Sequence, residues 1–396
     1  MKIAIFSDTF FPRINGVANM VRLLAKSLAE AGHEVFIFTI SQYSQKSLNN
    51  LINAEKNLTV ITLPSVPTPI YKGERLTLPI GLSLRFLKKI KPDVIHVHTP
   101  FTVGLEAILA AKILKIPLIG THHTFYDYYL KHVKLDYNWA KKISWKYTVF
   151  YYNHCDLILN PSQLLTDTMI AEGLKKPAGV LRNFIETDFF KPVANKQTKL
   201  RLKDKFGIKG KSITYMGRLS YEKNIDQVIK AFALALKTQP NLKLMLIGDG
   251  PERNNLEKLA EKLGIKNNVI FTGFLQGENL LSALQTNDVF VTASKSENMP
   301  LSVIEAMAVG LPCVAVKEKG LPELIKDGYN GFLVEADKPE ELTEKILKLL
   351  TQPKLLEKFS AASRLLALEY SKEKITQKLI NIYNQVKKDY ENLHLS

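Results

Sequence analysis

The hydrophobic positions of the chain show two patterns, one typical of strands and one typical of helices, which alternate along the sequence. Nearly continuous apolar runs of strand length recur through the first half, and between them apolar residues return every three or four positions, as in amphipathic helices. Val17–Ala31 has this helical spacing, and Gly32 ends it. Apolar strands separated by helices predict a buried parallel sheet. The predicted strands are Lys2–Ser7, Val35–Ile40, Leu58–Leu63, Asp93–His98, Pro117–Thr121 and Asp156–Asn160.

The pattern weakens around Glu186–Gln197 and then resumes, and the chain ends in a charged amphipathic helix over Ser371–Tyr390. The fold class is therefore α/β, with two Rossmann-like, doubly wound domains facing a cleft. We expect an N-terminal domain over residues 1–188, a C-terminal domain over 189–370, and a last segment, 371–396, that packs back towards the first domain. The strands predicted in the second half are Ser212–Met216, Lys243–Ile247, Val269–Thr272, Val289–Thr292 and Cys313–Val316.

Composition and charge narrow the class of protein. With 46% hydrophobic and 23% charged residues, the 396-residue chain has the balance of a folded soluble protein. Its net charge is +16, of which residues 1–185 carry +10. Such an excess of positive charge suits an anionic partner, either nucleic acid or lipid. Surface lysines that serve only to keep the protein soluble would produce the same net charge. No apolar run is long enough to cross a bilayer, and Asp8 interrupts the first one before a signal peptide forms, so we expect a cytoplasmic protein.

Two glutamates in the second half have the chemistry of a sugar site. Glu297 lies in the turn between the strand Val289–Thr292 and a helix, and Glu305 lies two helical turns later. A carboxylate accepts two hydrogen bonds and suits adjacent hydroxyls of a sugar or ribose, while free N–H groups at a helix start suit a phosphate. The alternative is that both are ordinary acids at a helix N-terminus.

Two cations follow the first strand of the second half. Gly217 permits a tight turn there, and Arg218 and Lys223 place positive charge at the mouth of the predicted cleft. Such charges stabilise a departing diphosphate, although a solvated loop has the same composition. Gly248 and Gly250 repeat the strand–turn–helix arrangement after the next strand.

Histidines gather at strand ends in the first half: His96 and His98 on one strand, and His122 and His123 after the next. Alternate positions of a strand share a face, but no carboxylate or cysteine completes a zinc site, so we expect no metal. The first strand-to-helix connection contains Gly16 without the glycine pattern of a dinucleotide site, which argues against a dehydrogenase.

Glu297 and Glu305, with seven residues between them and Gly310-Leu311-Pro312 after them, resemble the paired-glutamate signature of retaining glycosyltransferases of the GT-B fold, family 4 type. Gly320-Leu321-Pro322-Glu323 and Asn330–Val334 extend the resemblance. It implies that Glu297 contacts the donor sugar, Glu305 the ribose, and Arg218 with Lys223 the diphosphate, without a metal. His123 then bonds the transferred sugar. The remaining implied donor-binding residues are Gly16, Gly217, Gly248, Gly250, Phe274, Leu275, Asn298, Met299, Pro300 and Leu301.

Lysines interleaved with aromatics at helical spacing follow His123, and this pattern describes a helix lying in a lipid interface. Core aromatics with solvated lysines are the alternative. The segment most resembles bacterial glucosyltransferases acting on diacylglycerol and then phosphatidylinositol mannosyltransferases. The residues assigned to acceptor or membrane are Asp8, Tyr126, Lys131, Lys134, Trp139, Lys141, Lys142, Trp145 and Lys146.

The expected function is that of a retaining hexosyltransferase, EC class 2.4, that moves a hexose from a UDP-glucose-like donor to a membrane lipid such as diacylglycerol. It would be peripheral on the inner face of the cell membrane and would use no cofactor, because the nucleotide-sugar is a substrate. The same chemistry on a soluble sugar or glycan remains open. A nucleotide-sugar epimerase would lack this glutamate pair, and no nucleic-acid-binding motif supports a role for nucleic acid. The donor sugar and its base stay undecided.

Overall fold

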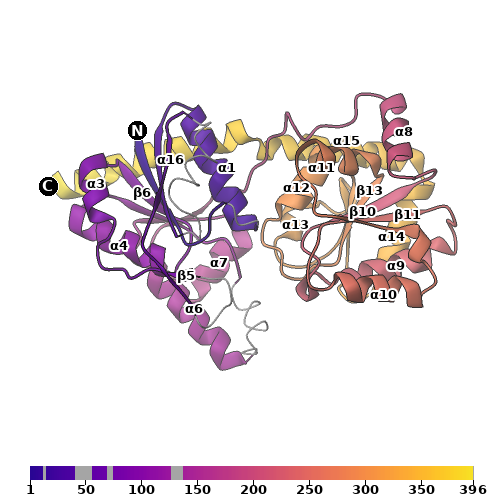
Figure 1. Ribbon diagram of the computed structural model, residues 1–396, viewed down its shortest axis with the longest axis horizontal. Coiled ribbons are helices and arrows are strands. Elements are labelled where there is room, and N and C mark those ends of the chain that lie inside the picture. The colour runs from indigo at the N-terminus through magenta and orange to yellow at the C-terminus, as the bar shows by residue number, and fades with distance from the viewer. Residues whose placement is uncertain (12–14, 41–55, 69–74, 126–136, 396) are drawn as a thin grey trace. The chain divides into compact units, whose positions relative to one another are not determined.

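A computed structural model of the chain describes residues 1–11, 15–40, 56–68, 75–125 and 137–395. The chain divides into two compact units (Figure 1). Unit 1 comprises Met1–Asn183 together with Lys372–Ser396, and unit 2 comprises Phe184–Ser371. Each unit has its own buried apolar core.

Unit 1 is built on a seven-stranded parallel sheet of order β3-β2-β1-β6-β7-β8-β9. A short antiparallel pair, β4 with β5, stands apart from it. The strands are β1 Lys2–Ser7, β2 Glu34–Thr39, β3 Leu58–Thr62, β4 Val66–Pro67, β5 Arg75–Leu76, β6 Val94–Val97, β7 Leu118–Thr121, β8 Leu157–Asn160 and β9 Ala178–Val180.

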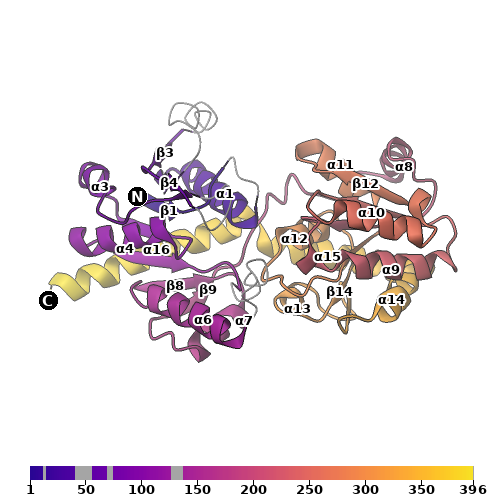
Figure 2. The same ribbon diagram turned by 60° about the horizontal axis from the view of Figure 1, so that its bottom comes forward.

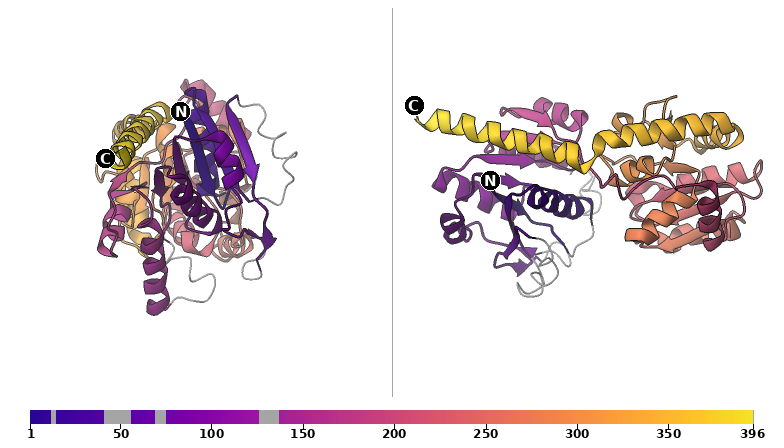
Figure 3. Two further views of the ribbon diagram at one scale, coloured as in Figure 1. Left: turned by 90° about the vertical axis from the view of Figure 1, so that its left-hand side faces the viewer. Right: turned by 90° about the horizontal axis from the view of Figure 1, so that it is seen from above.

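The helices of unit 1 come from both ends of the chain. The C-terminal helix α16 lies against α1, next to the N-terminal strands (Figure 3). Helices α3 and α4 pack against each other, and α6 and α7 follow the strands β7 and β8 (Figure 2). Their bounds are α1 Gly16–Glu30, α3 Leu84–Ile90, α4 Thr102–Leu114, α6 Asn138–Tyr152, α7 Gln163–Ala171 and α16 Lys372–Leu395.

Unit 2 contains a six-stranded parallel sheet of order β12-β11-β10-β13-β14-β15. Helices α9, α10 and α14 lie on one side of it, and α11, α12 and α15 on the other (Figure 1). The strands are β10 Ser212–Met216, β11 Lys243–Ile247, β12 Val269–Gly273, β13 Val289–Thr292, β14 Cys313–Val316 and β15 Gly331–Val334. The helices are α8 Lys196–Lys205, η2 Tyr221–Lys223, α9 Ile225–Leu236, α10 Arg253–Lys262, η3 Lys266–Asn268, α11 Gly277–Thr286, α12 Leu301–Ala308, α13 Leu321–Leu324, α14 Pro339–Thr351, α15 Pro353–Ala367 and η4 Leu368–Tyr370.

Each sheet has a point where the strand order reverses. In unit 1 it lies between β1 and β6, and in unit 2 between β10 and β13. The loops that leave the carboxyl ends of these strands diverge and form the usual ligand-binding place of an open α/β sheet. The predicted α/β class with two doubly wound units is confirmed, and β1, β10, β11, β13 and β14 have the predicted bounds.

A buried carboxylate ties α8 to the sheet of unit 2. Asp288 accepts hydrogen bonds from the Nζ atoms of Lys199 at 2.8 Å and Lys203 at 2.9 Å, and from the backbone N–H of Ser212 at 3.0 Å. Burial by itself would raise the pKa of Asp288, but the two ammonium groups outweigh it and hold that pKa below its ordinary value.

We expect Asp288→Asn to lower the free energy of unfolding of unit 2 by about 3 kcal/mol at pH 7, because it leaves two lysines beside a neutral amide. A lowered pKa gives stability that is present above the unfolded-state pKa, near 4, and lost as pH falls through the folded-state value. The deficit measured by urea denaturation should therefore shrink towards pH 3. Glu261→Gln, which breaks an exposed pair with Lys266 at 3.4 Å, is the control and should change stability by less than about 1 kcal/mol.

Candidate functional site

Two glycine turns build one wall of the candidate site in unit 2. Gly217 follows β10 with φ +156°, and Gly248 follows β11 with φ +136°. Their backbones touch: Gly217 N–H donates to Ile247 at 3.0 Å, and a Cβ on Gly248 would lie 2.0 Å from the Gly217 oxygen. A Cβ on Gly250 would similarly meet the Leu219 oxygen at 2.3 Å. Larger residues cannot enter these turns without moving the backbone, which explains the glycines at these positions.

The loop after β13 forms the opposite wall. Asn298, Met299 and Pro300 are buried, and α12 begins at Leu301 with Pro300 as its N-cap. Gly320 holds this loop from behind, because its N–H donates to the Glu297 oxygen at 3.0 Å and a Cβ there would lie 1.5 Å from the Asn298 oxygen. The buried loop thus keeps the Glu297 side chain at the surface of the wall.

Lys223 and Glu297 join the two walls across the reversal point of the sheet. Lys223 Nζ lies 2.6 Å from Glu297 Oε1, with side-chain exposures of 13% and 20%. Asn224 adds a second link, donating from its side chain to the Ala293 oxygen at 3.2 Å. The carboxylate and the ammonium that were predicted for different parts of a donor therefore contact each other in the structure.

The other predicted donor residues follow neighbouring strands of the same sheet, at the edge where this pair lies. Arg218 is exposed directly after Gly217. Glu305 lies on α12, and burial raises its pKa to about 8. Phe274, 51% exposed, and Leu275, half-buried, follow β12. The edge thus offers two cations, two carboxyl groups and an apolar ring, a set that suits a nucleotide carrying a sugar.

Asp8, at the carboxyl end of β1 in unit 1, forms hydrogen bonds with residues at the start of α4. It accepts from Val103 N–H at 2.8 Å, from Thr99 Oγ1 at 2.7 Å and from Thr102 Oγ1 at 3.0 Å. Burial raises the pKa of Asp8, while these hydrogen bonds oppose the rise. The carboxylate thereby caps a helix across the reversal point of its sheet. Gly16 is exposed at the first position of α1, and a Cβ there would meet nothing within 4 Å.

The two histidines after β7 have different surroundings. His122 is fully buried, with its ring against those of Tyr152 and Trp145 at centroid distances of 5.2 and 6.1 Å. His123 is half-buried, and its Nε2 lies 3.0 Å from Nδ1 of His98, which directly follows β6. Within the described ranges, no three His, Cys, Asp or Glu side chains are placed to hold a metal ion.

Comparisons with known proteins decide the family. The model described as "Glycosyltransferase Family 4" matches residues 14–189, and "Glycosyl transferases group 1" matches residues 197–366. The alpha-monoglucosyldiacylglycerol synthase of Streptococcus pneumoniae is 35% identical over 338 residues, covering 84% of this chain and 75% of that protein. The synthase of the same name from Acholeplasma laidlawii is 30% identical over 397 residues, covering 97% and 96%.

The chain belongs to glycosyltransferase family 4.

The protein is therefore a retaining glycosyltransferase of EC class 2.4 that uses a nucleotide-sugar donor, and the resemblance noted from the sequence is confirmed. The crystal structure of Anabaena HepE in complex with UDP-glucose shares the fold, with a TM-score of 0.76 at 19% identity over 97% of this chain and 100% of that one. This likeness extends the confirmed fold class to GT-B.

Helix α6 of this glycosyltransferase presents an unusual outer face. Trp139, Ile143 and Phe150 are each about 60% exposed, and Lys142 and Lys146 lie exposed among them. Lys141 is half-buried beside them. An open hollow of about 560 Å³ lies at the start of the helix, lined by Asn138, Trp139, Lys141, Lys142, Trp145 and Glu172.

Trp145 does not share that outer face, which corrects the anchoring role expected of it. Its ring is 8% exposed and packs edge-on against Phe125 at 6.3 Å. Six positions after Trp139, it lies well around the helix, so the two tryptophans have opposite environments. Tyr126, Lys131 and Lys134 were assigned to the same surface, but they lie outside the described residues.

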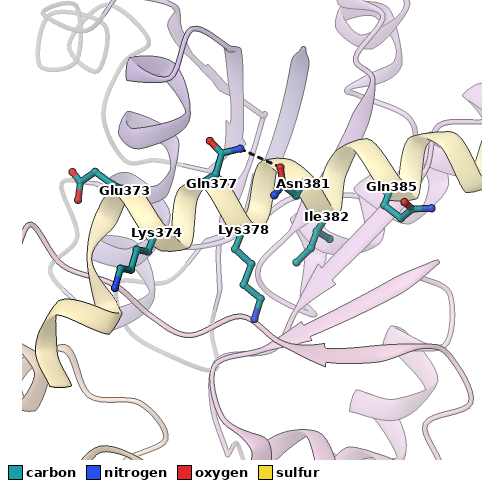
Figure 4. Close-up of a pocket in the computed structure, with 7 residues that line it drawn as sticks. All are labelled: Glu373, Lys374, Gln377, Lys378, Asn381, Ile382 and Gln385. Atoms are coloured by element: carbon teal, nitrogen blue, oxygen red, sulfur yellow. Dashed lines mark hydrogen bonds between the residues drawn. The ribbon is translucent and has the colours of Figure 1, made fainter.

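An open depression of about 840 Å³ runs along α16, and Figure 4 shows the side chains that line it, all of them polar except Ile382. Lys378 reaches from there to the Val180 oxygen at 2.9 Å, and Gln377 bonds Asn381 at 3.1 Å. The lining contains no residue predicted for donor or acceptor, so we do not place the candidate site there. No functional role was assigned to His98 from the sequence, although its spacing from His96 in one predicted strand was a visible signal.

Proposed function

We propose that this family 4 enzyme transfers glucose from UDP-glucose to a lipid acceptor such as diacylglycerol, at the anionic inner face of the cell membrane. Unit 2 would bind the donor and unit 1 the acceptor. The observation that carries the proposal is the outer face of α6, where Trp139, Ile143 and Phe150 stand exposed among lysines. The names of the two synthases, which cover most of the chain at 30–35% identity, support the same acceptor.

The donor side of the proposal follows from the contacts in unit 2. Arg218 and Lys223 would hold the diphosphate, Glu297 the sugar hydroxyls and Glu305 the ribose, with Phe274 and Leu275 beside the base. As the bond between the anomeric carbon and the phosphate oxygen breaks, negative charge collects on the diphosphate, and fixed cations stabilise it. The acceptor oxygen would bond the same face of the carbon and release its proton to the departing phosphate, with His123 bonded to the sugar.

The chemistry is tested by incubating the purified protein with a panel of nucleotide-sugars and a membrane lipid extract, with mass spectrometry of the products. A glucosylated diacylglycerol formed from UDP-glucose is the expected product, and EDTA should leave its formation unchanged because the two cations act at the diphosphate. A soluble glycan product would replace the lipid part of the proposal. Full loss on chelation, restored by one divalent ion, would contradict the proposed role of Arg218 and Lys223.

The α6 face predicts how the protein binds membranes. No helix among the described residues combines the length and the apolar character that spanning a bilayer requires. Binding would therefore combine shallow insertion of Trp139 and its apolar neighbours with attraction of about 1 kcal/mol per lysine near an anionic surface. We expect binding to phosphatidylglycerol vesicles to rise with their anionic content and to fall with salt.

Replacing Lys141, Lys142 and Lys146 together with glutamate should remove most of this binding in a vesicle sedimentation assay. Hydrolysis of the donor in solution should persist, because none of the three belongs to the donor site. The control variant reverses the charge of three exposed lysines of unit 2, Lys258, Lys262 and Lys266. If both triple variants lose binding alike, the attraction depends on net charge and not on α6.

A further inference from the structure

A row of three histidines lies in unit 1 at the carboxyl ends of β6 and β7. His96 lies on β6 and His98 directly follows this strand, and their ring centroids lie 4.2 Å apart. Next to them on the sheet, β7 leads to His123, whose ring lies nearly parallel to that of His98, at 5.3 Å and 19°. The hydrogen bond of 3.0 Å between His98 Nδ1 and His123 Nε2 joins the two rings edge to edge in the row.

Both members of that hydrogen bond are neutral near pH 7. Burial lowers the pKa of His98 well below its ordinary value, and burial also lowers the pKa of His123 to about 4. A neutral imidazole has one nitrogen that donates and one that accepts. One ring must therefore donate to the other, and the choice fixes the tautomer of both.

The far nitrogen of His98 decides which ring donates. His98 Nε2 is buried and has no hydrogen-bond partner among the residues that the structure describes. A proton there would be a buried N–H without an acceptor, which proteins tolerate less often than an unsatisfied acceptor. The proton of His98 therefore belongs on Nδ1, where it is donated to His123 Nε2. His123 must then carry its own proton on Nδ1.

His96 supports this arrangement from behind. Its Nδ1 lies 2.6 Å from the hydroxyl of Tyr383 on α16, and its Nε2 lies 2.7 Å from Thr121 Oγ1 on β7. Both ring nitrogens of His96 are thus occupied, and its ring is a fixed surface against which His98 packs. The C-terminal helix, distant in sequence, thereby stabilises the strand end that carries His98.

We propose that His98 is a positioning residue for His123, which it holds in one ring orientation and in the Nδ1–H tautomer through the Nδ1-to-Nε2 hydrogen bond. The inference rests on the proposed role of His123 at the transferred sugar. A fixed tautomer presents a donor, and never a bare nitrogen, at the Nδ1 side of His123. Without His98, this hydrogen bond no longer selects the tautomer and orientation of the His123 ring, so turnover falls while donor binding in unit 2 is untouched.

Two substitutions of His98 separate the effect of its hydrogen bond to His123 from the effect of its side-chain volume. Asparagine places its amide nitrogen the same number of bonds from the backbone as Nδ1 of histidine, so His98→Asn keeps the donor. His98→Leu fills the space without one. We expect His98→Leu to lower kcat by about tenfold or more, the loss that one hydrogen bond implies, with KM for UDP-glucose unchanged. His98→Asn should recover most of kcat.

Two further measurements make the test independent of a folding defect. His98→Leu added to His123→Ala should lower kcat no further, because a positioning residue acts through the residue it positions. In ¹⁵N-histidine NMR spectra of the whole protein, the His123 resonances should report Nδ1–H in the wild type and a mixture in His98→Leu. Equal losses in His98→Leu and His98→Asn, multiplying effects in the double variant, or an Nε2–H tautomer in the wild type would each overturn the inference. Full turnover by His123→Ala alone would instead contradict the proposed role of His123 at the sugar. The NMR experiment measures the tautomer of His123 whether or not that role is correct.

Discussion

Glu297→Gln is expected to lower kcat for transfer on the order of a hundredfold and, in the same protein, to tighten the binding of UDP. The first effect follows from the loss of charge-assisted hydrogen bonds to the donor sugar, about 2–3 kcal/mol. The second follows from the ion pair of 2.6 Å between Glu297 and Lys223. UDP has no sugar to engage Glu297, so its diphosphate must compete with that carboxylate for Lys223. Removing the competitor should lower Kd about threefold to tenfold, in line with a partly exposed ion pair.

Isothermal titration with UDP and steady-state kinetics with UDP-glucose measure the two effects separately. The matched control is Asp337→Asn, which removes the partner of Lys295 in the same loop and should change neither quantity appreciably. Weaker UDP binding by Glu297→Gln would show that the ion pair orders the site instead of competing with the diphosphate. Lys223→Ala should weaken UDP and UDP-glucose alike, because both carry the diphosphate.

The strands were predictable because a buried parallel strand is an apolar run with sharp ends. β10 and β13 match their predicted bounds for this reason. The edge strand β9, Ala178–Val180, was not predicted, because its half-exposed residues Ala-Gly-Val form no such run. The two-residue strands β4 and β5 are shorter than any window in which a period can be recognised.

Contacts within the site were less predictable, because they depend on which strands are neighbours. Lys223 and Glu297 are 74 positions apart, and their pairing requires β10 to lie beside β13. Likewise, the bond between His98 and His123 exists because β6 pairs with β7. The sequence indicated that these residues follow strands, but it did not order the strands. Trp145 is different, because the spacing of six positions from Trp139 places the two side chains on different faces of a helix. The sequence alone therefore indicated that only one of the two tryptophans could lie on the outer face.

The donor-binding step should depend steeply on pH, through Glu305. Burial raises the pKa of this carboxyl to about 8, so the free enzyme holds it protonated at pH 6–7. If the ribose hydroxyls donate to the carboxylate, binding must first remove that proton. The apparent affinity for UDP-glucose then rises with pH, by up to about tenfold per unit below pH 8, and levels off above it. UDP-glucose is the suitable probe, because its diphosphate is esterified at both ends and does not titrate in this range.

The two histidines of unit 1 that the proposal uses do not add to this pH dependence. His123 has a pKa near 4 and the pKa of His98 is also far below neutrality, so both stay neutral from pH 6 to 9. Glu305→Gln keeps a side chain that accepts hydrogen bonds but cannot titrate. It should bind UDP-glucose more weakly than the wild type at pH 8 by about 2 kcal/mol, with a Kd independent of pH.

The free energy of unfolding should change with pH in the opposite direction to the affinity. Because the pKa of Glu305 is raised in the folded protein, its contribution to stability is full below the unfolded-state pKa, near 4, and is lost as the pH rises through 8. We expect affinity to increase and stability to decrease over the same pH range, and both trends to be abolished in Glu305→Gln, which would assign them to this one carboxyl. A wild-type Kd for UDP-glucose that does not change with pH would contradict the proposed contact between Glu305 and the ribose.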